Sequence, residues 1–150
     1  MAKFVYKLQN ILDIKMRLET QARTAYAQAQ ARLNEEENKL KELCARRAGY
    51  QEAYRQEAQS GKIMDFAAMA RLNQSCEIMD KLIQRQRVSV DVANKNLELA
   101  RGRLNDAMQD RKTHEKLREK AFQDFLVELN DEEKKEIDEL VSFKYNNSEE

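Results

Sequence analysis

The stretch from Met69 to Phe125 decides the fold, and it reads MARLNQSCEIMDKLIQRQRVSVDVANKNLELARGRLNDAMQDRKTHEKLREKAFQDF. Steps that alternate between three and four residues, begun at Met69, land on an apolar residue at 13 of 17 positions. The positions are Met69, Leu72, Cys76, Met79, Ile83, Gln86, Val90, Ala93, Leu97, Ala100, Leu104, Ala107, Arg111, His114, Arg118, Ala121 and Phe125. An unbroken 3-4 repeat predicts a long helix that pairs with another helix in a left-handed coiled coil.

The first half of the chain carries a second, less regular apolar stripe. Its members are Leu8, Ile11, Leu18, Ala22, Ala25, Ala29, Leu33, Leu40, Leu43, Tyr50 and Tyr54. The steps around Leu33 shift the phase of this stripe by one residue. We therefore expect a local change in the supercoil at that point.

The segment Gln59–Asp65 separates the two stripes. Gly61 is a helix terminator, and Asp65 is a suitable N-cap for the following helix. Helices joined by a short loop run antiparallel. The sequence predicts an all-α fold, a long antiparallel two-helix coiled-coil hairpin that forms a single domain over residues 1–150. We expect helices over about 5–58 and 66–129, with the turn at about 59–65.

A turn near residue 62 sets which residues face each other, because their numbers must sum to about 124. This register brings Phe4 and Leu8 close to Phe122 and Phe125, so that aromatic rings meet at the open end of the hairpin. A helix from residue 8 to 58 would be roughly 75 Å long at 1.5 Å per residue.

The chain after residue 129 has a different character. Residues 131–150 hold eight acids and three bases, a net charge of −5 in a chain whose formal net charge is zero. Asn130 and Glu133 match a capping box, so we expect a new short helix over about 131–143. That helix would carry an apolar stripe of Ile137, Leu140 and Val141 with Lys144, and residues 146–150 would be disordered.

Composition excludes several classes of protein. Charged residues make up 36% of the chain, aromatic residues 7%, and proline is absent. A narrow seam between charged faces suits these values better than a compact core. No basic patch of the kind that binds nucleic acid is present, and no apolar run is long enough for a membrane span or a signal peptide. We expect a cytoplasmic protein.

The sequence contains no motif that predicts a catalytic site, a metal site or a cofactor site. His114 is the single histidine, and it lies between Arg111 and Arg118 on the stripe, where a polar seam residue is expected. The acids Glu35–Glu37 are predicted to be solvated. Cys44 and Cys76 are predicted to be small buried hydrophobic residues that a reducing cytosol keeps as thiols.

Two groups of residues allow two interpretations each. The polar stripe positions Gln86, Arg111, His114 and Arg118 could fix the register of the pairing or present charge to a partner. Tyr50 and Tyr54, spaced four apart near the turn, could pack in the seam or form a partner-binding surface.

The chain resembles the FliJ family in several motifs that occur in the same order. The opening FVYKLQNILDIK, residues 4–15, is similar to the family pattern F-x-Y-x-L-Q-x-V-L-D-I-K. Further matches are Leu40-Lys-Glu-Leu43, Tyr50-Gln-Glu-Ala-Tyr54, Ser60-Gly61, Met79-Asp-Lys-Leu82-Ile83-Gln84, Phe125 and Glu133-Lys-Lys-Glu-Ile-Asp-Glu-Leu140. Arg47 departs from the pattern, since the family can have an apolar residue there.

This resemblance implies a non-enzymatic component of the flagellar type III export apparatus with a coiled coil like the central stalk of rotary ATPases. It implies that the open end enters the hexameric ring of the export ATPase FliI, through Phe4, Leu8, Phe122, Phe125, Ile137 and Leu140. It implies that the region near the turn binds the export gate protein FlhA, through Tyr50, Tyr54, Met79, Leu82 and Gln86. Export chaperones are further implied partners, at the inner face of the cell membrane. A structural coiled-coil stalk or spacer unrelated to flagellar export is the alternative.

Overall fold

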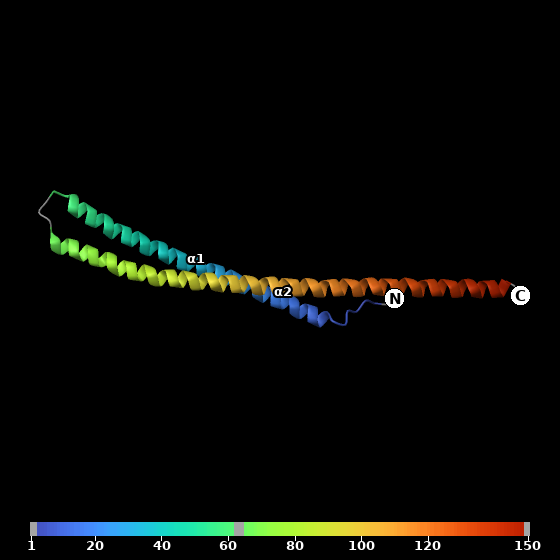
Figure 1. Cartoon of the computed structure of the whole chain (residues 1–150). Helices are drawn as coiled ribbons and strands as arrows, with labels where there is room; N and C mark the ends of the chain where they lie inside the picture. Colours follow the sequence, from blue (N-terminus) through green and yellow to red (C-terminus); the bar gives the residue numbers. More distant parts are fainter. Residues whose placement is uncertain (1–2, 62–64, 149–150) are drawn as a thin grey trace. The chain divides into compact units, whose positions relative to one another are not determined.

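The chain folds into two long α-helices. The structure, a computed structural model, describes residues 3–61 and 65–148. Helix α1 comprises Gln9–Gln59 and helix α2 comprises Phe66–Ser148, and no strand occurs in the described part of the chain (Figure 1). The predicted all-α two-helix hairpin is confirmed. Residues 62–64 of the predicted turn lie outside the described residues.

The chain divides into two compact units. We call residues 22–104, which include the turn between the helices, the turn unit. Residues 1–21 together with 105–150 form the terminal unit. Each unit contains one segment of α1 and one of α2. The expectation of a single domain stays a prediction.

Helix α1 ends and α2 begins with the residues that the sequence pointed to. Gly61, two residues beyond Gln59, has a φ of +65°, in the left-handed region that glycine adopts without a steric penalty. The carboxylate of Asp65 accepts hydrogen bonds from the backbone amides of Ala67 and Ala68, each at 3.1 Å. Asp65 is therefore the N-cap of α2, because its side chain satisfies amides that have no partner inside the helix.

The seam of α2 follows the predicted repeat. Of the 17 predicted positions, all except Arg118 are buried or half-buried. In the turn unit Leu33 of α1 packs with Ala93 and Leu97 of α2, and Tyr26, Ala29 and Val90 pack around them. The coiled-coil seam of α2 is confirmed.

The seam of α1 differs from the predicted stripe. Apart from the half-buried Gln30 and Glu37, its buried and half-buried positions from Leu12 to Tyr50 keep an unbroken 3-4 spacing. They are Leu12, Lys15, Glu19, Ala22, Tyr26, Ala29, Leu33, Glu36, Leu40, Leu43, Arg47 and Tyr50. The predicted members Leu8, Ile11, Leu18, Ala25 and Tyr54 are exposed, and the seam has no phase shift near Leu33. The predicted stripe of α1 was wrong because charged residues occupy several seam positions. A stripe traced only through apolar residues leaves those positions out.

The predicted ends of the helices also need correction. Helix α2 continues without a break through Asn130 to Ser148, including part of the tail expected to be disordered (Figure 1). The chain has no glycine or proline after Gly102 to stop it, and in a continuous helix the amides near Asn130 already have partners. At the other end α1 begins at Gln9 and not near residue 5. Before Gln9 the chain makes a turn, in which the Gln9 amide bonds to the Tyr6 carbonyl at 3.1 Å.

Two leucines that lie two residues apart test the assignment of the seam. Leu97 is 5% exposed and Leu99 is 60% exposed. Leu97→Ala should lower the free energy of unfolding by about 2–4 kcal/mol, because it leaves a cavity in the seam. Leu99→Ala should change it by less than about 0.5 kcal/mol. Urea unfolding followed by circular dichroism measures both, and equal effects of the two substitutions would contradict the assignment.

Candidate partner-binding surfaces

An aromatic cluster joins the start of the chain to α2 in the terminal unit. The ring centroid of Phe4 lies 5.1 Å from that of Phe122, with an interplanar angle of 73°, and 5.5 Å from that of Phe125. The guanidinium carbon of Arg118 lies 5.8 Å from the centre of the Phe4 ring. Edge-to-face rings and a cation over a ring face are favourable arrangements. The predicted meeting of Phe4 with Phe122 and Phe125 is confirmed.

Polar bonds hold this cluster to the first turn of α1. Arg118 Nε donates to Gln9 Oε1 at 3.0 Å, and Gln9 Nε2 donates to Asp13 Oδ1 at 2.9 Å. The side chain of Arg118 therefore extends from its seam position to the surface, which explains why it is exposed. A surface hollow of about 570 Å³ lies beside the cluster, lined by residues of the segment 4–8 and by α2 residues that include Phe125.

The other predicted residues of the terminal unit, Leu8, Ile137 and Leu140, are exposed. Leu8 precedes α1, and Ile137 and Leu140 lie in residues 131–148 of α2, all of which are exposed. Ile137 is 59% exposed and Leu140 is 62% exposed. These side chains contribute little to the packing of the described chain, so they are available to another molecule.

The five residues predicted to bind the gate fall into two groups. Met79 is buried in the seam, so it presents little surface. Gln86, Tyr50 and Leu82 are half-buried, and Tyr54 is exposed. These four side chains are the ones that a partner could cover directly.

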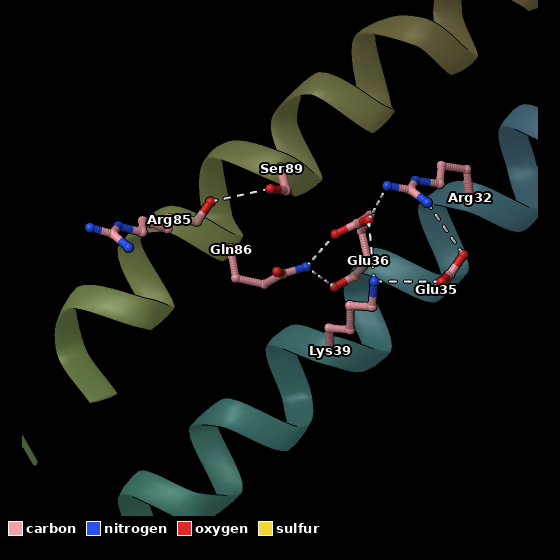
Figure 2. Close-up of polar contacts among 7 residues, drawn as sticks. All are labelled: Arg32, Glu35, Glu36, Lys39, Arg85, Gln86 and Ser89. Carbon is pink, nitrogen blue, oxygen red and sulfur yellow. Dashed lines mark hydrogen bonds and ion pairs between the residues drawn. The ribbon is translucent and has the colours of Figure 1, made fainter. Parts of the chain in front are cut away.

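Gln86 makes its bonds inside the turn unit. Its amide Nε2 donates to the backbone carbonyl of Glu36 at 2.8 Å and also to the Glu36 carboxylate (Figure 2). The same carboxylate receives Arg32 Nη2 at 2.9 Å, and Lys39 Nζ lies 3.8 Å away. Glu36 is 4% exposed, so the prediction of a solvated acid was wrong for this residue. Its position in the 3-4 repeat buries it, and these donors compensate for lost hydration.

The terminal unit contains a second buried carboxylate in its seam. Glu19 is buried and pairs with Arg111, which also bonds to Glu115 at 2.8 Å. Hydrogen bonds from Arg111 to Glu115 and Glu19 raise the pKa of Arg111 above its ordinary value. Internal partners for Gln86 and Arg111 favour the register interpretation of the polar seam positions.

Some candidate residues were missed by sequence reasoning. Phe66, the first residue of α2, is 75% exposed in the turn unit, and Ile78 is also exposed. Both lie outside the 3-4 repeat of α2, and an apolar residue off the seam is the signal that could have found them. Arg47, which departs from the FliJ pattern, makes an ion pair across the seam with Asp80, and this hydrogen bond raises the pKa of Arg47.

The two cysteines do not come together. Both are free, Cys44 exposed and Cys76 half-buried. The prediction of burial was wrong for Cys44, and no disulfide joins the two residues.

Two other kinds of site are absent from the part of the chain that the structure describes. Over residues 3–61 and 65–148, no group of three acidic, histidine or cysteine side chains comes together in a way that could hold a metal ion. Among the same residues, no helix combines the length and the apolar character that a membrane crossing requires.

The bond between Gln86 and Glu36 can be tested by a double-mutant cycle. Gln86→Leu should lower the free energy of unfolding by about 1–3 kcal/mol, because it removes a donor from a buried carboxylate. Adding Glu36→Leu should return the chain to within about 1 kcal/mol of the native value, because an apolar pair replaces the polar pair. Asp80→Ala, which removes an exposed ion pair, is the control and should cost less than about 1 kcal/mol. A double variant less stable than both single variants would refute this role.

Comparison with known proteins assigns the chain to a family. A structure described as that of a YscO homologue, CT670 from Chlamydia trachomatis, superimposes with a TM-score of 0.80 over 96% of each chain. At 21% identity this likeness shows the fold alone. The comparison with curated proteins gives no match. The model of the flagellar FliJ protein family matches residues 4–150. The chain therefore belongs to the FliJ family, whose members are non-enzymatic components of the type III export apparatus.

Proposed function

We propose that this chain links the flagellar export ATPase FliI to the export gate protein FlhA and escorts export chaperones to them. In this proposal the chain works in the cytoplasm, at the inner face of the cell membrane beneath the flagellum. Membership of the FliJ family supports the choice of partners. Hydrolysis of ATP belongs to FliI, and the chain contributes binding surfaces.

The observation that carries the proposal is an uncovered apolar stripe on the acidic end of α2. Ile137, Leu140 and Val141 are each about three-fifths exposed, and their spacing places them on one face of the helix. A helix whose apolar face meets only water gains little from that face, so the stripe suits a surface that becomes buried on binding. We assign this stripe, together with Leu8 and the cluster of Phe4, Phe122 and Phe125, to the FliI ring.

A second exposed set lies in the turn unit. Tyr54 and Phe66 are exposed, and Tyr50 and Leu82 are half-buried. Tyrosine often dominates binding energy, because it combines a large apolar ring with a polar end and has few rotatable bonds. We assign these residues to FlhA. Met79 and Gln86 support this surface from the seam.

Variants that remove the FliI contact and the FlhA contact one at a time test the proposal. Ile137→Asp with Leu140→Asp places charge in the stripe and should reduce stimulation of FliI hydrolysis at least about tenfold, with FlhA binding retained. Tyr50→Ala with Tyr54→Ala should weaken FlhA binding by a similar factor and leave FliI stimulation intact. FliI turnover and calorimetric titration of the FlhA cytoplasmic part measure the two effects.

Ser142→Asp is the matched control, because it adds charge to the same exposed helix outside the stripe. It should leave both measurements unchanged. If the native chain neither stimulates FliI nor binds FlhA, the linking role is lost and a purely structural coiled coil is the better description. If both double variants lose both activities together, the assignment of separate surfaces is wrong.

A further inference from the structure

A second apolar line runs along α2 in the turn unit, on the side away from the seam. It consists of Val88, Val92, Lys95 and Leu99, and we call it the outer stripe. Val88, Val92 and Leu99 are 62%, 51% and 60% exposed. The 4-3-4 spacing is that of a coiled-coil contact line. Because the seam residues Val90, Ala93 and Leu97 alternate with it in sequence, the outer stripe faces away from α1.

The outer stripe is unusual for a two-helix coiled coil. Positions opposite the seam are normally charged or polar, since they face water on every side. Here three branched apolar side chains occupy one line within three helical turns. The surface beside Leu99 is also hollowed, with a shallow depression of about 650 Å³ lined by Asn94, Lys95, Glu98 and Leu99. Isolated exposed apolar residues are common in proteins, but a line with helical spacing indicates a contact surface.

Unpaired cations accompany the outer stripe. Arg85, Lys95 and Arg103 are exposed, and none forms an ion pair with another described residue. Figure 2 shows the side chain of Arg85 directed away from α1. By contrast, Arg101 pairs with Glu98 at 3.2 Å. Asp91 lies along one border of the stripe, so the cations remain in excess over the free acids.

We propose that the outer stripe is the docking surface for an acidic amphipathic α-helix of a partner protein, which would pack against α2 as a third strand. Apolar residues of that helix would fit around Val88, Val92 and Leu99. Its carboxylates would reach the unpaired cations, which span about 27 Å from Arg85 to Arg103, or five helical turns. The outer stripe shares no residue with either surface assigned above, so this inference goes beyond the proposed function.

The arrangement of charge favours a helix over a lipid surface as the occupant. Lys95 lies within the line, between Val92 and Leu99, so the apolar strip is only one side chain wide. A helix that lies in a membrane surface needs a broad apolar face, usually with aromatic residues, and keeps its cations on the opposite face. A third helix needs only a narrow line with charges beside it.

The test uses the full-length chain and two synthetic helical peptides of about three heptads, with leucine at the contact positions. One peptide has glutamate at the flanking positions, and the other has lysine there. Fluorescence anisotropy should show saturable binding of the acidic peptide alone. Val92→Asp with Leu99→Asp should weaken that binding at least about tenfold, and Val127→Asp in the terminal unit should leave it unchanged. Lys95→Glu with Arg103→Glu should transfer the preference to the lysine peptide.

Several results would overturn the proposal. One is equal binding of the two peptides, and another is absence of acidic-peptide binding up to about 1 mM. Sedimentation could show that the native chain is a dimer and that the variant Val92→Asp with Leu99→Asp is a monomer. The outer stripe would then bind a second copy of the chain. The native chain could also cosediment with phosphatidylglycerol vesicles while the same variant does not. In that case the occupant of the outer stripe would be a lipid surface. Circular dichroism of each variant excludes loss of the fold, since all the substituted residues are exposed.

Discussion

The carboxylate of Glu36 is buried in the seam of the turn unit, where it needs hydrogen-bond donors in place of water. Gln86 supplies one donor across the seam, and it is the single strongly polar residue among the α2 seam positions from Met69 to Ala107. A slip of one heptad would place Glu36 among Ala93 and Leu97 in one direction, or among Met79 and Ile83 in the other. In either slipped register Glu36 would keep Arg32 and Lys39 of its own helix but lose the bonds from Gln86, which costs about 1–3 kcal/mol. The apolar repeat permits all three registers, and this pair selects one.

The sequence predicted the parts of the fold that depend on apolar periodicity and on local turn chemistry. Helix α2, the left-handed Gly61 and the Asp65 cap were all foreseeable, because each depends on residues close together in the chain. The seam of α1 was not foreseeable, because Glu19 and Glu36 occupy seam positions that a search for apolar residues does not find. The partner across the seam that helps to satisfy each of these charges lies 50 or more residues away, so the local sequence does not reveal it.

The candidate surfaces follow a similar division. The meeting of Phe4 with Phe122 and Phe125 could be predicted, because it follows from the register of the pairing. The burial of Met79 and the internal bonds of Gln86 could not be read from the family motifs, since a motif residue can support a surface without forming it. The exposed Phe66 and the outer stripe both consist of apolar residues outside the 3-4 repeat. Once the repeat has accounted for the seam, the remaining apolar residues are the candidates for contacts with other proteins.

Disulfide trapping across the seam tests the selected register most directly. In a chain whose two native cysteines are replaced by serine, Leu33→Cys with Ala93→Cys places two thiols in one layer of the packed core. Leu33→Cys with Ala100→Cys places them one heptad apart. Mild oxidation should cross-link the first pair rapidly within one molecule and leave the second pair reduced. Comparable rates for the two pairs, or faster cross-linking of the second, would contradict a register that Glu36 and Gln86 fix.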